Sequence, residues 1–265
     1  MNNSNTRLPA LFIGHGSPMN ALEKNEFTAS WQAVGAGLSG VRAILVVSAH
    51  WLTPGTQVTA MEQPQTIHDF GGFPKELFAV QYPAPGAPAI ADELTALLQA
   101  TAPVRKNFNW GLDHGAWSIL VHMFPAADVP VLQLSIDADA TPEHYFAIGR
   151  ALRPLREQGI LIVGSGNIVH NLRLVDWARL GERNFAADWA REAMDISGKL
   201  LRDKDWQSLI AYEKLPQSMQ LAINSAEHYF PLLYILGAGY DDDPVKLFND
   251  VAVGGALSMT SLQLG

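Results

Sequence analysis

The chain has 265 residues, a net charge of −8 at neutral pH and no cysteine. A hydrophobic content of 48% with 17% charged residues is typical of a globular protein with a substantial core, and excludes a disordered chain. The acidic balance disfavours binding to nucleic-acid phosphates, and the lack of cysteine excludes disulfides, thiolate catalysis and cysteine-ligated zinc.

The first residues do not resemble a targeting segment. Residues 1–8 are polar and lack the apolar core of a secretion signal, and the apolar stretch 229–238 is too short to cross a bilayer. We therefore expect a cytoplasmic protein that binds neither membrane nor nucleic acid. We also expect a monomer or a small homo-oligomer, although the sequence does not fix the oligomeric state.

Short runs rich in Val, Ile and Leu alternate with longer helical patterns along the chain. The predicted strands are 9–13, 42–48, 56–61, 129–136, 160–164, 245–249 and 257–264. The predicted helices are 23–38, 87–100, 115–123, 142–157, 184–203 and 226–237. This alternation predicts an α/β fold, a single domain over 1–265 with a central mixed or mostly parallel sheet flanked by helices on both faces.

Three histidines follow predicted strands. His15 lies between Gly14 and Gly16 after the first strand, His50 follows the second, and His170 comes shortly after the strand 160–164. Ligands of open α/β sheets bind beyond the carboxyl ends of the strands, so we expect these imidazoles to share one site. In a chain without cysteine, a metal there must be held by histidines and carboxylates.

Two further histidines lie at predicted helix starts. His228 follows Glu227, and because adjacent helical residues point about 100° apart, only one of the two is expected to face the site. His228 is the favoured ligand and Glu227 the alternative. His114 follows Asp113, and a neutral histidine there can stabilise developing negative charge or relay a proton, with capping or packing as the alternative.

The segment 62–86 contains four prolines and three glycines with aromatic residues between them. An ordered loop of this length inside a compact domain is usually functional. The segment is therefore predicted to face the substrate, with a plain surface connection as the alternative.

Several motifs in order along the chain resemble the class III extradiol ring-cleaving dioxygenases, and in particular their DOPA 4,5-dioxygenase branch. They occupy residues 14–18, 47–51, 67–74, 82–86, 113–115, 164–166, 170–172 and 227–229. Each motif alone is weak, but their common order across nearly the whole chain is specific.

The resemblance implies one divalent metal ion held by His15, His50 and His228, with His170 as a fourth contact or as the acid/base. The wider superfamily uses two histidines and a glutamate, whereas this branch places His228 where the carboxylate stands. Neutral histidines suit zinc, which has no redox chemistry. We therefore expect Fe(II) for turnover and Zn(II) in the protein as isolated.

The implied reaction is the 4,5-cleavage of a catechol such as DOPA with O2. His170 and His114 are the catalytic candidates. The residues expected to line the substrate pocket are Ser17, Asp69, Phe70 and Tyr82.

Two other functions stay open at this point. A zinc-dependent hydrolase would use the same site with Glu227 or His170 as the base, although the chain lacks H-E-x-x-H. A non-catalytic interaction protein on the same scaffold would be expected to have lost ligands, and the retention of His15, His50, His170 and His228 argues against it.

Overall fold

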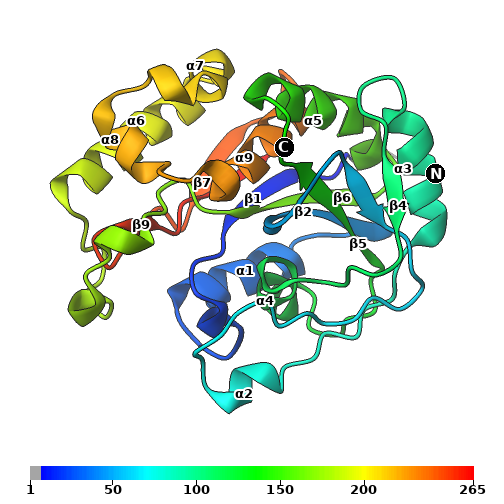
Figure 1. Cartoon of the computed structure of the whole chain (residues 1–265), viewed down its shortest axis with the longest axis horizontal. Coiled ribbons are helices and arrows are strands. Elements are labelled where there is room, and N and C mark those ends of the chain that lie inside the picture. Colours follow the sequence, from blue (N-terminus) through cyan, green and yellow to red (C-terminus); the bar gives the residue numbers. More distant parts are fainter. Residues whose placement is uncertain (1–6) are drawn as a thin grey trace.

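The computed structural model describes residues 7–265 (Figure 1). An eight-stranded mixed sheet has the order β4-β3-β5-β2-β6-β1-β10-β7, which confirms the predicted α/β class. Its strands are β1 (Ala10–Gly14), β2 (Ala43–Thr53), β3 (Gln57–Thr59), β4 (Arg105–Asn107), β5 (Val131–Asp137), β6 (Ile160–Gly166), β7 (Val245–Phe248) and β10 (Ser261–Leu264). A separate two-stranded sheet pairs β8 (Ala252–Val253) with β9 (Leu257–Ser258).

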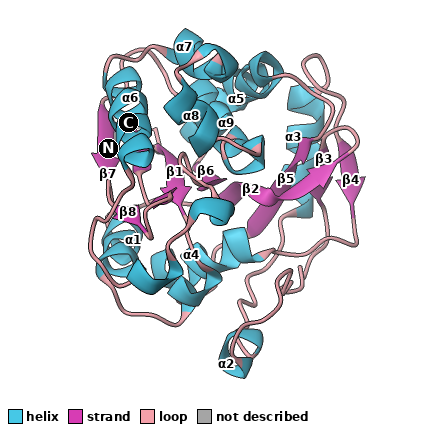
Figure 2. Ribbon diagram, turned by 60° about the vertical axis from the view of Figure 1, so that its left-hand side comes forward, coloured by secondary structure: helices cyan, strands magenta, loops and turns pink. Residues whose placement is uncertain are grey.

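Helices cover both faces of the large sheet (Figure 2). They are α1 (Glu26–Ala36), α2 (Lys75–Phe78), α3 (Pro88–Leu98), α4 (His114–Met123), α5 (Pro142–Glu157), α6 (Asp188–Arg202), α7 (Trp206–Ile210), α8 (Gln217–Ala222) and α9 (Phe230–Ala238). Helices α3, α5 and α9 lie on one face, and α1 and α4 lie on the other. Across residues 7–265, none of these helices combines the length and apolar character that a bilayer crossing requires.

The centre of the sheet is parallel and buried on both faces. Strand β2 pairs in parallel with β5 and with β6, and β6 pairs in parallel with β1. Successive side chains of β2 enter different cores: Leu45 and Val47 face the α5–α9 side, while Ile44 and Val46 face the α1–α4 side. This burial on both faces explains why the sequence shows a continuous apolar run here instead of alternation.

Strand β2 is longer than the sequence predicts. Its pairing with β5 shifts register between Val47 and Leu52, and the strand continues to Thr53. The prediction that His50 lies beyond the end of its strand is therefore wrong, because His50 sits inside this irregular stretch. Such irregularities re-aim side chains, and they are common next to active sites.

Other element boundaries differ for local reasons. The predicted strand 257–264 is broken into β9 and β10, and the predicted helix 226–237 begins as the 3₁₀ turn η5 (Ala226–His228) before α9. The predicted helix 23–38 starts only at Glu26, because the Asn25 side chain accepts hydrogen bonds from the first turn of α1. Strand β4 and helices α2, α7 and α8 were not predicted, since each is too short to show a period.

The buried Arg156 ties distant segments together. Its guanidinium donates hydrogen bonds to the carbonyls of Leu8, Ala238 and Leu264. Its Nη1 also lies 2.6 Å from the carboxylate of Asp243, whose side chain is buried as well. The pair therefore joins α5 to the start of β1, the end of α9 and the end of β10.

We expect Asp243→Asn to lower the free energy of unfolding by about 3 kcal/mol at neutral pH, because it leaves a buried guanidinium unpaired. Burial by itself raises the pKa of Asp243, but hydrogen bonds from Arg156 and the Tyr240 amide outweigh it and lower that pKa. The carboxylate therefore stabilises the fold above its unfolded pKa of about 3.9, and this contribution disappears as the pH falls through the folded pKa.

Urea unfolding at neutral and at acidic pH measures this effect. The matched control is Asp242→Asn, which removes an exposed carboxylate paired with Arg7. Equal losses of stability in the two variants would contradict the assignment.

Candidate metal centre and active site

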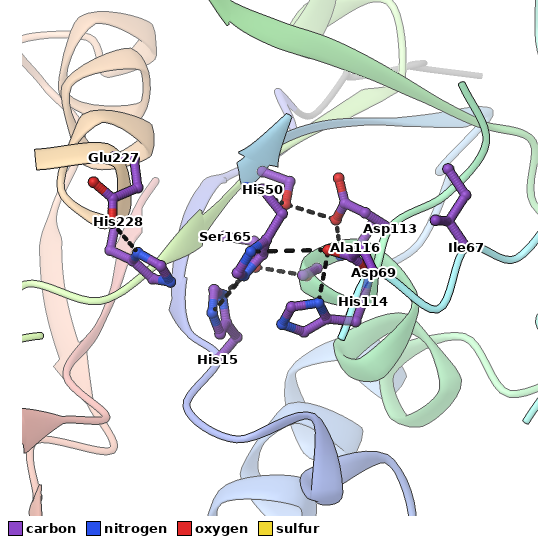
Figure 3. Close-up of polar contacts among 12 residues, drawn as sticks. His15, His50, Ile67, Asp69, Asp113, His114, Ala116, Ser165, Glu227 and His228 are labelled. Atoms are coloured by element: carbon purple, nitrogen blue, oxygen red, sulfur yellow. Dashed lines mark hydrogen bonds and ion pairs between the residues drawn. The ribbon is translucent and has the colours of Figure 1, made fainter. Parts of the chain in front are cut away.

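Four histidines from separate elements face one another near the carboxyl-terminal ends of the central strands (Figure 3). His15 follows β1, His50 lies in β2, His114 begins α4 and His228 ends η5. The ring of His15 is centred 5.0 Å from that of His50 and 5.3 Å from that of His228. One ligand atom from each of His15, His50 and His228 lies within 4.8 Å of the others, so this trio can hold a metal ion.

The tautomer of His15 follows from its neighbours. The Ser165 hydroxyl donates its single hydrogen to the Gly115 carbonyl at 2.6 Å. It must therefore accept from His15 Nδ1, which lies 2.9 Å away. The Nε2 of neutral His15 then carries a lone pair, and it lies 3.2 Å from the Nε2 of His50. At this separation the two nitrogens could both bind one metal ion.

Glu227 orients His228 in a similar way. The carboxylate of Glu227 lies 3.2 Å from His228 Nδ1, on the side away from His15 (Figure 3). Burial raises the pKa of Glu227, but hydrogen bonds from His228 and Ser225 outweigh it and lower the pKa to about 2. An ionised Glu227 accepts from Nδ1–H and leaves Nε2 free. Of the two alternatives in the sequence, His228 rather than Glu227 joins His15 and His50.

Two imidazoles of the trio, those of His15 and His50, are held in the neutral form. Burial, followed by repulsion from the neighbouring histidines, lowers the pKa of His15 well below its ordinary value. Burial and the proximity of His114 lower the pKa of His50 to about 2. Neutral imidazole is the form that binds metal ions, so the donor chemistry fits a divalent cation.

His170 lies beside the trio without joining it. Its ring stacks on that of His228 at 3.6 Å between centroids, with 8° between the planes. It forms a possible ligand group with Glu227 and His228, but not with His15 or His50. Burial and the adjacent His228 lower the pKa of His170 to about 3.

Asp69 forms hydrogen bonds with His114 through both of its carboxylate oxygens. One oxygen accepts from the backbone amide of His114 and the other lies at its Nδ1, both at 2.9 Å. Burial raises the pKa of Asp69, but these hydrogen bonds outweigh it and lower that pKa. The expectation that Asp69 lines the pocket is therefore corrected. Asp69 hydrogen-bonds to His114, and the ring of His114, with its Nε2 unbound by Asp69, lines the cavity instead.

Sequence reasoning missed the buried network behind His114. Asp113 is fully buried and caps α4 through the amide of Ala116. Its carboxylate accepts from Ser48 Oγ and from Gln133 Nε2, each at 2.7 Å. Burial, assisted by the charge of Asp69, raises the pKa of Asp113. The acid directly before His114 was visible in the sequence, but its partners on β2 and β5 were not.

The histidines open into a cavity of about 850 Å³, a size suited to a small organic molecule. Ser17 and Phe70 line it as expected, and Phe73 comes from the same proline-rich loop. The structure does not bring Tyr82 to this cavity. Tyr82 is buried, and its hydroxyl donates to the Phe124 carbonyl at 3.0 Å.

Comparison with known proteins gives matches over nearly the whole chain. Residues 9–257 match the family described as the catalytic LigB subunit of aromatic ring-opening dioxygenase. A protein of Escherichia coli K12 named 4,5-DOPA dioxygenase extradiol is 46% identical, over 99% of this chain and 96% of its own. The enzyme of the same name from Beta vulgaris is 34% identical, over 94% of each chain.

A solved structure has the same fold. The crystal structure of an uncharacterized protein from Escherichia coli K12 superposes with a TM-score of 0.84 at 43% identity. The match covers 98% of this chain and all of the other, so the fold is shared throughout.

We expect His15→Ala and His50→Ala each to weaken Zn(II) binding more than about 100-fold, because loss of an outer hydrogen-bond partner alone costs about 10- to 100-fold. Ser165→Ala removes the acceptor of His15 Nδ1–H and should fall within that smaller range. Competition with a chelator measures all three affinities, with His144→Ala on α5 as the control. Wild-type affinity in both ligand variants would contradict the ligand assignment.

Proposed function

Given that the chain belongs to the family of catalytic LigB subunits of aromatic ring-opening dioxygenases, we propose that it cleaves a small catechol such as DOPA beside its hydroxyls. Membership makes the chain an oxidoreductase of the ring-cleaving dioxygenase class, as its motifs indicate. The proposal adds the catechol, 4,5-cleavage with O2, and one divalent metal ion held by His15, His50 and His228.

The observation that carries the proposal is the arrangement of these three imidazoles. Hydrogen bonds at Nδ1 of His15 and of His228 turn the other nitrogen of each ring toward the trio. Three protein ligands leave coordination positions free for small molecules. When bound, the metal supplies a Lewis acid that lowers the pKa of the catechol hydroxyls and brings both reactants together.

Fe(II) is the ion we propose for turnover, because zinc has no redox chemistry. The three-histidine set also accepts Zn(II), so we expect the protein as isolated to contain zinc.

His170 is the proposed acid/base. It lines the cavity next to His228, and its pKa of about 3 keeps the ring neutral at neutral pH. A neutral ring nitrogen can take the proton of a catechol hydroxyl whose own pKa a bound metal would lower, and return it later in the reaction.

His114 is the second proposed catalytic residue. Asp69 binds Nδ1–H, so Nε2 of the neutral ring is an acceptor directed by a carboxylate, as in other carboxylate–histidine pairs. The pair can therefore hold a substrate proton at Nε2, or stabilise negative charge once that nitrogen is protonated.

The aromatic ring of the substrate is expected to lie against Phe70. Phe70 packs edge-on against His114 and Phe73 at centroid distances of 5.5 Å and 5.3 Å. This apolar wall excludes water and places a planar ring beside the histidines.

Oxygen uptake with DOPA tests the function directly. Protein stripped of metal and reloaded anaerobically with Fe(II) should consume O2 and form a yellow ring-opened product, whereas the Zn(II) form should not. Absence of uptake with either ion across a panel of catechols would overturn the proposal. Hydrolysis of ester or amide substrates by the Zn(II) form would then favour the zinc hydrolase.

We expect His170→Ala to lower kcat about 100-fold or more while keeping one metal ion per chain, because it removes a proton-transfer group. Turnover and metal content are measured on the same preparation, with His144→Ala as the control. Loss of the metal from His170→Ala would make His170 a ligand instead.

A further inference from the structure

The cavity that contains the histidines carries charged groups at its open end. Glu23, Glu26, Glu182 and Arg183 line it, and all four are exposed. Among its described lining residues, Arg183 is the one lysine or arginine. A substrate that enters the cavity therefore has its outer end beside these groups.

One ion pair orients the Arg183 side chain and leaves some of its hydrogen-bond donors available. Its Nε and Nη2 donate to the two oxygens of Glu26, each at 2.9 Å. Glu26 begins α1, whereas Arg183 lies shortly before α6, so the pair joins two walls of the cavity. The Nη1 hydrogens take no part in this bond. An oriented guanidinium with free donors on one edge suits a further carboxylate.

Glu23 differs from the other acids of the rim. Glu182 is bound by Arg179 through two hydrogen bonds of 2.8 Å and 2.6 Å, and Glu26 is bound by Arg183. Glu23 accepts from the Asn25 side chain at 3.2 Å, and no ion pair engages it within residues 7–265. Its carboxylate is therefore the acid of this rim that is available to a cation.

We propose that Arg183 and Glu23 bind the α-amino acid end of the substrate, the carboxylate at Arg183 and the ammonium at Glu23. This inference rests on the proposed function, because it places the catechol end at the histidines. Arg183 and Glu23 then determine the specificity for catechols that carry a zwitterionic side chain.

The position of the charges favours this assignment. The inner cavity has aromatic walls, whereas Arg183 and Glu26 have side chains that are 71% and 43% exposed. A zwitterion at the rim keeps part of its hydration, so binding it there avoids the desolvation cost of a buried ion. A catechol without charges would leave the free edge of Arg183 and the carboxylate of Glu23 unmatched.

Equilibrium binding by isothermal titration tests the inference without turnover. The metal-loaded protein is titrated under nitrogen with DOPA and three analogues. Dopamine lacks the carboxylate, 3,4-dihydroxyphenylpropionate lacks the ammonium, and 4-methylcatechol lacks both.

Arg183→Gln should raise the Kd of DOPA and of 3,4-dihydroxyphenylpropionate about tenfold, as expected for loss of a charge-assisted hydrogen bond. It should leave the Kd of dopamine and of 4-methylcatechol unchanged, and Arg183→Lys should restore part of the lost affinity for DOPA. Glu23→Gln should weaken the binding of DOPA and dopamine, the two ligands with an ammonium group, and leave that of the other two unchanged. The matched control is Arg179→Gln, which breaks a two-bond ion pair with Glu182 and so also frees an acid of the rim, while Arg179 itself does not line the cavity.

An equal effect of Arg183→Gln on all four ligands, or no more effect than Arg179→Gln, would overturn the inference. So would wild-type protein that binds 4-methylcatechol as tightly as DOPA. Oxygen uptake with 4-methylcatechol tests ring cleavage alone, since this probe lacks the head group. Selective binding without any uptake would therefore reject the proposed function and leave this assignment intact.

Discussion

Hydrogen bonds at the Nδ1 atoms of the histidines are the constraint on which the site depends. Ser165 accepts from His15, Glu227 from His228, and Asp69 from His114. Each bond selects a tautomer and turns Nε2 of that ring away from its partner. A cation bound between His15, His50 and His228 would give the facing lone pairs of these three rings a common partner.

The sheet provides the rigid frame for these partners. Ser165 lies in β6 and His15 directly follows β1, which pairs with β6 in parallel up to Gly14 and Gly166. Ser48 in β2 connects to Asp113 at the start of α4, so the position of His114 depends on the same central strands. The irregular stretch of β2 then directs His50 toward the others. Accurate placement of the rings follows from buried strands that have little freedom to move.

The cavity has two chemically distinct ends. The inner end has histidines and aromatic side chains, and the outer end has an oriented arginine among acids. A molecule with a planar diol at one end and charges at the other matches both. The charged residues at the outer end are thus the basis for proposing a charged ligand, which the histidines alone do not indicate.

Local patterns in the chain were sufficient for the fold class and for most of the predicted residues that the structure brings together around one cavity. Apolar runs mark the buried strands because both faces are covered, and glycines around His15 mark a sharp turn after a strand. Only the folded chain revealed three contacts: Asp69 hydrogen-bonds to His114, buried Tyr82 donates to the Phe124 carbonyl, and Arg183 pairs with Glu26. These contacts join residues 45, 42 and 157 positions apart. Such contacts depend on how the strands and loops pack, and no local period in a single sequence encodes that packing.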